Sequence, residues 1–183
     1  MREIIIQLHM WVMNYLVAYI PIWPLRKLFY KLSGMKIGKY SHISMGCFVY
    51  CPWKISIGNE TYINEKCVLD GRGGLTIGNY VNLSYGSAIF TGAHDIKSSS
   101  FAYKRQEVEI KDMVWLCANA MVMPGSLIEE GVVVTAGSVA TKNKSLNEGY
   151  KAYKIYMGNP AVEVGNREID GQYMPEVYKP HFK

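Results

Sequence analysis

Between residues 37 and 96, aliphatic side chains recur at every sixth position within each of three successive lines, and two extra residues separate one line from the next. This stretch divides into three lines of twenty residues that each open with Ile-Gly, and the repeated aliphatic positions are Ile37, Ile43, Val49, Ile57, Ile63, Leu69, Ile77, Leu83 and Ile89. A period of six is neither the period of a helix nor the alternation of a simple strand. A fixed internal period indicates one stacked structural unit per repeat. We therefore predict a three-sided coil in which each hexad forms a short side and a turn.

The residues two positions before each aliphatic support this coil. Side chains two apart lie on the same face of a strand, so these residues also point into the narrow interior and should be small or slim. They are Ser41, Cys47, Thr61, Cys67, Val81 and Ser87. The pattern resumes at Ile110, Leu116, Val122, Ile128, Val134 and Ala140. We count about five rungs, interrupted once between residues 92 and 108.

These repeats resemble the hexapeptide-repeat acyltransferases from residue 37 to about residue 165. The resemblance implies an all-β solenoid in the form of a left-handed parallel β-helix, and its handedness comes from the family alone. It also implies a homotrimer with active sites between subunits. We expect a hydrophobic helical segment at 1–32, the β-helix domain at 33–165 with an active-site loop at 92–108, and an irregular tail at 166–183.

The first 32 residues differ in composition from the repeats. No charged side chain occurs from Ile4 to Leu25, and three basic residues follow, Arg26, Lys27 and Lys31. Pro21 and Pro24 should end or kink a helix near Tyr19. Three interpretations remain open: a helix packed on the end of the solenoid or between subunits, an interfacial membrane helix with its basic cluster on lipid headgroups, and a true membrane span.

The net charge does not identify a binding partner, whereas the cysteine content indicates the cellular compartment. The net charge of +5 suits a polyanionic cosubstrate or an acidic membrane surface, and no nucleic-acid-binding signature occurs. The four cysteines form neither a zinc-ribbon spacing nor a redox pair, and Cys47 and Cys67 should stack in one internal column. With no recognisable cleavable signal, this pattern predicts a cytoplasmic protein whose association with a membrane is left open.

The interruption at 92–108 is the predicted place of the chemistry, because a long loop in a regular repeat is usually functional or disordered. It begins Thr91-Gly92-Ala93-His94-Asp95. His94 follows the last aliphatic of the third rung, where hexapeptide acyltransferases carry their catalytic histidine. The resemblance therefore implies that His94 is the general base, and imidazole titrates in the range this role needs. Asp95 either orients the ring or turns the loop.

Four further positions are predicted to contact the acceptor. Asn64 matches an acceptor-binding asparagine of the galactoside and maltose acetyltransferases of this family. Asp70 lies near their acidic acceptor-contacting position, but the run Asp-Gly-Arg-Gly-Gly at 70–74 could equally be a corner turn. Trp115 matches a tryptophan beside the active site, where it could pack on a sugar or on pantetheine, or simply pack on the surface. Asp95 is the fourth position.

The run from Val133 to Lys142 resembles the coenzyme A motif of the family's last rung. The resemblance implies that the pantetheine arm lies between two subunits against small residues, and that the nucleotide end is met further along the run. The positions concerned are Ala118, Ala136, Gly137, Thr141 and Lys142. Gly158-Asn159-Pro160-Ala161 matches the family's exit from the solenoid. It is followed by Val162, Glu163, Val164 and Gly165, where relatives often have basic residues, so Lys144, Lys151 and Lys154 are possible substitutes at the 3′-phosphate.

We therefore predict an acetyl-CoA-dependent O-acetyltransferase that acts on a sugar or glycan precursor in surface polysaccharide assembly and uses no metal. Acceptors such as serine or an antibiotic are alternatives. A non-catalytic β-helix scaffold is another, because fold alone does not confer function. A zinc enzyme resembling the γ-class carbonic anhydrases would need three ligands, and only His94 lies in the predicted active-site region, with His42 two rungs earlier.

Overall fold

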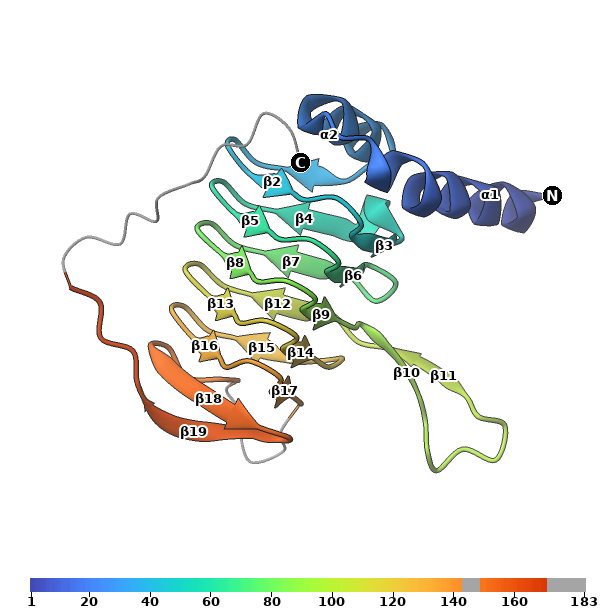
Figure 1. The fold of residues 1–183 in the computed structure, drawn as a ribbon. Coiled ribbons are helices and arrows are strands. Elements are labelled where there is room, and N and C mark those ends of the chain that lie inside the picture. Colours follow the sequence, from blue (N-terminus) through green and yellow to red (C-terminus); the bar gives the residue numbers. More distant parts are fainter. Residues whose placement is uncertain (143–148, 171–183) are drawn as a thin grey trace.

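The computed structural model describes residues 1–142 and 149–170, and these form a parallel β-solenoid closed at one end by helices (Figure 1). Five complete rungs stack to give three flat faces. A sixth rung is represented by a single strand on the second face. The predicted β-helix of about five rungs is confirmed, and the additional partial turn was not anticipated.

Each face contains one short strand from every rung. The first face consists of β1 (Lys36–Ile37), β4 (Ile55–Ile57), β7 (Leu75–Ile77), β12 (Val108–Ile110) and β15 (Leu127–Ile128). The second consists of β2 (His42–Ile43), β5 (Tyr62–Ile63), β8 (Asn82–Leu83), β13 (Trp115–Leu116) and β16 (Val133–Val134). The third consists of β3 (Phe48–Tyr50), β6 (Val68–Asp70), β9 (Ala88–Ile89), β14 (Met121–Val122) and β17 (Val139–Ala140).

The register of the strands explains the period of the sequence. Ile37 pairs with Ile57, and Ile57 pairs with Ile77, so one rung of this part takes twenty residues. Ile110 pairs with Ile128 one rung further on, after only eighteen residues. This rung consists of three hexads and lacks the two extra residues of the earlier rungs. The corner that leads from β3 of the first rung to β4 of the second contains the 3-10 turn η2 (Pro52–Lys54). Three hexads are therefore the minimal rung of this coil.

The core is one continuous column of the predicted aliphatic residues. Ile43, Val49, Ile63, Leu69, Leu83 and Ile89 have no exposed side-chain surface. Burial of each such side chain is worth about 1.5–3 kcal/mol. The slim inward residues are buried as well, and the polar ones bond to the backbone of the next rung, as Ser41 Oγ does to Gly58 O at 2.6 Å and Thr61 Oγ1 to Gly78 O at 2.7 Å. These buried hydroxyls therefore have hydrogen-bond partners inside the solenoid.

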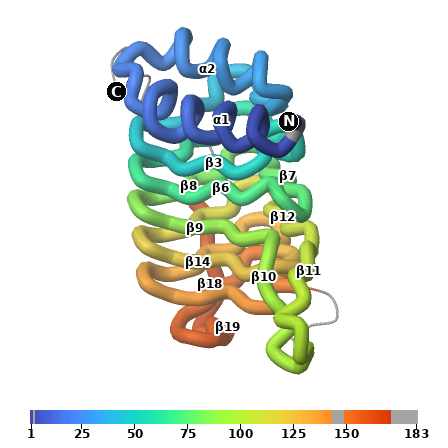
Figure 2. The backbone as a smooth tube through the Cα atoms, turned by 90° about the vertical axis from the view of Figure 1, so that its right-hand side faces the viewer, coloured from blue at the N-terminus to red at the C-terminus, as the bar shows by residue number. Residues whose placement is uncertain are grey.

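The N-terminal segment caps the first rung. It consists of α1 (Arg2–Tyr15), the 3-10 turn η1 (Val17–Tyr19) and α2 (Trp23–Leu32), which begins with Pro24 in its first turn (Figures 1 and 2). The side chain of Asn14 accepts from Val49 N at 2.7 Å and donates to Val49 O at 3.0 Å, as a further strand would. Arg26 donates to Ile43 O at 2.9 Å. The interpretation as a packed cap is therefore confirmed.

No helix among the described residues is long and apolar enough to cross a membrane. The membrane-span interpretation finds no support in these helices, because the helical segment is divided at residues 16–22, around the predicted break near Tyr19.

At the other end, β18 (Lys154–Gly158) extends the second face beside β16 and turns back into the antiparallel strand β19 (Ala161–Asn166). The exit motif Gly158-Asn159-Pro160-Ala161 forms the turn of this hairpin. Of the predicted tail at 166–183, residues 171–183 lie outside the described residues.

Candidate active site

The interruption of the repeats is a β-hairpin that projects from the solenoid at the corner between the third and first faces (Figures 1 and 2). Its strands are β10 (Gly92–His94) and β11 (Tyr103–Arg105), which pair antiparallel, with His94 opposite Tyr103. The sequence indicated an interrupting loop, and the structure shows that both its ends are ordered by strand pairing. His94 is thus carried on a strand, outside the solenoid.

The ring of His94 is fixed by two contacts with Phe101 of the same hairpin. Its Nδ1 lies 2.7 Å from the backbone oxygen of Phe101, and the two rings stack with centroids 3.9 Å apart. Because a carbonyl oxygen only accepts, Nδ1 carries the proton in the neutral ring, and Nε2 keeps its lone pair. The side chain of His94 is exposed. The hairpin therefore presents an oriented imidazole with a free basic nitrogen to the outside of the chain.

The carboxylate of Asp95 contacts Lys104 and the backbone of Lys97. It pairs with Lys104 Nζ at 2.7 Å and accepts from Lys97 N at 3.0 Å. The bond from Lys104 and the bond from the Lys97 backbone hold the pKa of Asp95 below its ordinary value. Of the two roles left open for Asp95, these contacts favour the one in which it turns the loop.

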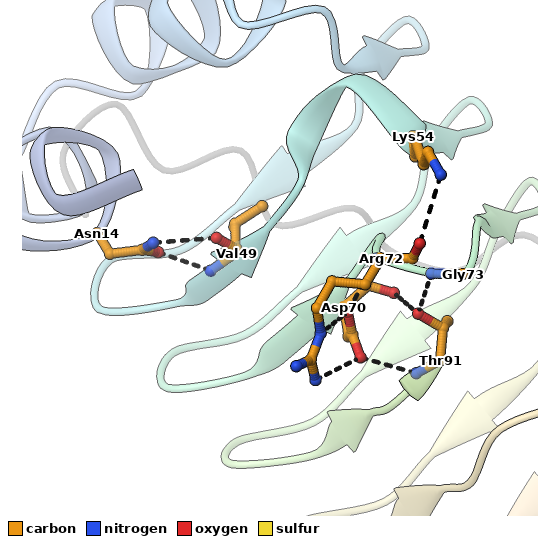
Figure 3. A network of polar contacts seen from close by, with 7 residues as sticks. All are labelled: Asn14, Val49, Lys54, Asp70, Arg72, Gly73 and Thr91. Carbon is orange, nitrogen blue, oxygen red and sulfur yellow. Dashed lines mark hydrogen bonds and ion pairs between the residues drawn. The ribbon is translucent and has the colours of Figure 1, made fainter. Parts of the chain in front are cut away.

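Asp70 is buried at the base of the hairpin, where it ties two rungs together (Figure 3). Its carboxylate accepts two bonds from the Arg72 side chain and one from Thr91 N, each at 2.9 Å. Burial by itself would raise the pKa of Asp70, but the bonds from Arg72 and Thr91 outweigh it and keep the pKa below its ordinary value. These contacts favour the corner-turn role, and contact with an acceptor stays a prediction.

Arg72 is a neighbour of the site that the sequence analysis missed. Its guanidinium lies over the ring of Tyr50 at 4.5 Å and over that of Tyr103 at 5.6 Å, while it pairs with Asp70. Tyr103 meets the His94 ring edge-on at 5.1 Å. The only signal in the sequence was the glycine-rich run, which indicated a turn and no contact with the histidine hairpin.

Of the other predicted residues, Asn64 and the pantetheine positions lie at a different corner, between the second and third faces, and Trp115 of β13 reaches that corner. Asn64 follows β5 and accepts from Glu65 N at 3.0 Å. Trp115 is 42% exposed, and its Nε1 donates to Ser84 Oγ at 2.9 Å. Ser84 was missed, although its place twenty residues after Asn64 in the repeat could have identified it. Asn64 and Ser84 therefore hold equivalent positions in adjacent rungs, and Trp115, which pairs with Asn82 of β8, reaches Ser84 from the next rung.

The same corner continues into the small residues of the coenzyme A motif. Gly137 N donates to Ala118 O at 3.0 Å, so the two turns stack directly. Gly137 has a φ of +68°, a conformation that glycine adopts without cost, and among the described residues a Cβ placed there would meet no atom within 4 Å beyond its two chain neighbours. Ala136 and Gly137 are exposed. Ala136 and Gly137 thus form an open edge of small residues at this corner, where a narrow ligand would lie against the backbone.

Thr141 and Lys142 do not lie on this edge. They lie at the corner between the third and first faces, the corner from which the hairpin projects. Thr141 follows β17, and its backbone N and O both bond to the Tyr150 hydroxyl, at 2.8 and 3.0 Å. Lys142 is exposed and lies beside Gly125, as does Gln106, which follows β11. Within one chain, the predicted site is therefore divided: Asn64, Trp115, Ala118, Ala136 and Gly137 lie at one corner, and Asp70, His94, Asp95, Thr141 and Lys142 at the next.

The substitutes considered for the 3′-phosphate have different surroundings. Lys154 pairs with Glu163 at 3.0 Å and contacts Asn166, so it holds the β18–β19 hairpin together. Lys151 is exposed. Lys144 lies outside the described residues. Within those residues, no three His, Cys, Asp or Glu side chains are grouped so that they could hold a metal ion.

The fold and the histidine hairpin define a class, the β-solenoids built of hexapeptide repeats. A hexapeptide-repeat acetyltransferase from Vibrio cholerae, VCA0836, in complex with acetyl coenzyme A superposes with a TM-score of 0.79 at 20% identity, covering 92% of this chain and 90% of that one. AntD, an N-acyltransferase from Bacillus cereus in complex with dTDP and 3-hydroxybutyryl-CoA, superposes with a TM-score of 0.61 at 22% identity, over 78% and 88% of the two chains. These likenesses establish the fold.

The family follows from a relative in sequence. The protein named colanic acid biosynthesis acetyltransferase WcaF from Escherichia coli strain K12 is 32% identical over 142 residues, which are 78% of this chain and 75% of that one. An acetyltransferase of Staphylococcus aureus strain MRSA252 is 29% identical over 128 residues, 68% of this chain and 60% of that one. No family model matches the chain. The chain belongs to the hexapeptide-repeat acetyltransferase family and is an acetyltransferase.

Proposed function

We propose that the protein transfers an acetyl group from acetyl-CoA directly to a hydroxyl of a sugar or glycan precursor in polysaccharide biosynthesis. The observation that carries the proposal is the fixed His94 ring, whose Nδ1 is occupied by the Phe101 carbonyl while Nε2 is available. The name of the Escherichia coli relative, which refers to colanic acid biosynthesis, supports a polysaccharide acceptor. The acetyl-CoA complex of the Vibrio cholerae neighbour supports the donor.

The chemistry requires a base because a sugar hydroxyl is too weakly acidic to attack a thioester unaided. In the proposed step, the hydroxyl oxygen forms a bond to the thioester carbonyl carbon as its proton passes to His94 Nε2. Collapse of the tetrahedral intermediate then breaks the carbon–sulfur bond, and the proton leaves with the coenzyme A thiol. Each step balances without metal or redox chemistry.

Direct transfer is favoured over an acyl-enzyme. Cys117 is the cysteine nearest the open edge, between Trp115 and Ala118 in sequence. Burial raises the pKa of the Cys117 thiol, so it is mostly protonated at neutral pH and a poor nucleophile. All four cysteines are unpaired, which supports a reducing, cytoplasmic setting.

The division of the site between two corners supports a homotrimer. A single chain holds His94, Thr141 and Lys142 at one corner, and Asn64, Trp115 and the Ala136–Gly137 edge at the next. In a closed ring of three copies, one corner of each chain faces the other corner of its neighbour. Each active site would then combine His94 of one protomer with Asn64 and the coenzyme A edge of another.

A non-catalytic scaffold, or transfer to serine or an antibiotic, is the competing function. Thiol release from acetyl-CoA, measured against a panel of sugars, serine and aminoglycosides, distinguishes among these. We expect release with a sugar acceptor, and calorimetric binding of acetyl-CoA that does not change on addition of zinc. Absence of acetyl-CoA binding would favour the scaffold.

The base assignment has its own test. His94→Ala should lower kcat by about 10²–10⁴-fold, the range for loss of a general base, while acetyl-CoA binding and the melting temperature stay unchanged. His9→Ala on α1 is the histidine control and should behave as the wild type. Wild-type turnover in His94→Ala would remove His94 from the mechanism.

A further inference from the structure

The helix α1 has an apolar stripe on the side that the solenoid does not cover. Ile4, Leu8, Trp11 and Tyr15 follow one another at helical spacing and are 69, 61, 51 and 57% exposed. On the opposite side of the helix, Met13 and Asn14 are buried against the first rung. A surface helix normally carries charged and polar residues on its outer side. The outer side of α1 is therefore unusual for a helix in water.

The helix α2 repeats this arrangement. Leu25, Leu28, Phe29 and Leu32 have the spacing of a single stripe and are 39, 51, 37 and 74% exposed. Arg26 and Tyr30, which lie on its other side, are completely buried. Both helices lie at the same end of the solenoid (Figure 1). The cap thus has an inner side that closes the core and an outer side of large apolar residues.

The positive charge of the protein is concentrated at the same end. Residues 1–59 contain seven basic residues and one acidic residue, whereas residues 60–183 contain thirteen basic and fourteen acidic residues. Lys31, Lys36 and Lys39 are exposed on α2 and the first rung. A second copy of the chain would bring the same positive charge to this surface, whereas an anionic lipid surface complements it. The charge therefore favours an anionic lipid surface over a second copy of the chain as the partner of this surface.

We propose that the outer side of the cap binds the surface of an anionic phospholipid bilayer, with the two apolar stripes in the headgroup region and the lysines on lipid phosphates. Exposed Trp11 and Tyr15 suit this depth, because aromatic rings with one polar edge prefer the interface. The helices lie on the bilayer, since neither is long enough to span it.

The base of the histidine hairpin lies on the third rung, below the cap. The hairpin leaves the third face after β9, two rungs below β3, on which Asn14 of α1 is anchored. Two strand spacings correspond to about 10 Å. From this base the hairpin runs away from the cap (Figures 1 and 2), so the proposed contact attaches the enzyme to the bilayer by its opposite end.

The test is sedimentation with vesicles. The full-length protein is mixed with vesicles of phosphatidylcholine alone, or of phosphatidylcholine with about 30 mol % phosphatidylglycerol, at about 0.1 M and about 0.5 M salt. Leu8→Glu with Leu28→Glu places one charge in each stripe. Val162→Glu with Val164→Glu is the matched control, because these β19 side chains are 57 and 52% exposed at the opposite end and the change in charge is the same.

We expect the wild type and the β19 control to sediment with the anionic vesicles, with weaker binding at high salt, and the stripe variant to bind at least about tenfold less tightly. All three should share one melting temperature and one oligomeric state by analytical ultracentrifugation. Equal binding by the stripe variant and the control, or no sedimentation of the wild type, would overturn the proposal. A change of oligomeric state in the stripe variant alone would assign the surface to a second copy. Acetyl-CoA binding, measured in parallel, tests the proposed function independently.

Discussion

His42 shows how a buried titratable residue makes the cap sensitive to pH. Its ring lies between Trp23, with centroids 4.7 Å apart, and Tyr62, at 5.2 Å. Burial, followed by the charges of Arg26 and Lys27, lowers the pKa of His42 from 6.5 to about 4. Nε2 has no hydrogen-bond partner among the described residues. The folded protein therefore holds His42 neutral where the unfolded chain would protonate it.

This difference in the pKa of His42 makes the folded state less stable at acidic pH. Between pH 6.5 and about 4, the unfolded state binds more protons than the folded state. The contribution of neutral His42 to the free energy of unfolding is therefore complete above pH 6.5 and is lost as the pH falls toward 4. We expect His42→Phe, which keeps the stacking but cannot titrate, to reduce the loss of unfolding free energy across this range by about 1–3 kcal/mol after allowance for solvent screening. Urea unfolding at several pH values measures it. An identical pH slope in both proteins would contradict the explanation.

Asn14 is the residue on which the closure of the first rung depends. It occupies both backbone groups of Val49, so Asn14→Ala leaves a buried N–H and a buried C=O without their bonds. We expect a loss of about 2–4 kcal/mol in unfolding free energy, because each unsatisfied buried group costs about 1–3 kcal/mol. Gln7→Ala, a similar truncation on the exposed part of α1, should change it little. Equal denaturant midpoints for the two variants would mean that Asn14 does not hold the cap.

At the scale of elements, the histidine hairpin depends on its buried anchor. Asp70 joins the corner of the second rung to Thr91, directly before β10. Asp70→Asn replaces an ion pair with Arg72 by a weaker contact, and we expect a loss of about 2–3 kcal/mol in unfolding free energy and a lower kcat. Thermal denaturation and thiol release measure the two effects.

The control for this prediction comes from the same hairpin. Asp95 forms an exposed ion pair with Lys104, and such pairs contribute little to stability. Asp95→Asn should therefore leave the melting temperature close to that of the wild type. A larger shift for Asp95→Asn than for Asp70→Asn would mean that the hairpin is held at its tip rather than at its base.

At the scale of the whole molecule, the proposed trimer, in which each active site is shared between two subunits, predicts complementation. His94→Ala and Asn64→Ala homotrimers should each be nearly inactive. In trimers refolded from an equal mixture, about one quarter of the sites combine an intact His94 with an intact Asn64 from the neighbour, and about that fraction of the activity should return. Thiol release before and after mixing measures this. No recovery in mixed trimers, verified by mass spectrometry, would place both residues in one subunit's site.

The sequence predicts the solenoid well because its physics is local and repeated. Each hexad places one aliphatic side chain inward, and pairing of Ile37 with Ile57 and of Ile57 with Ile77 follows directly from the period. The place of the hairpin that carries His94 is also predicted from sequence, because an interruption of a strict repeat can be recognised along the chain alone. The carbonyl of Phe101 could not be found in this way, because every residue has a carbonyl and only the hairpin turns this one toward the ring.

The sequence by itself determined the parallel coil, its rung length, the place of its interruption and the helical character of the first 32 residues, because all four depend on neighbours along the chain. Only the tertiary structure decided that Asn14 substitutes for a missing strand, that Asp70 is an anchor and that the predicted site lies at two separate corners. These depend on contacts between residues about twenty or more positions apart. A linear pattern shows which side chains point inward, but their partners are fixed only when the rungs stack.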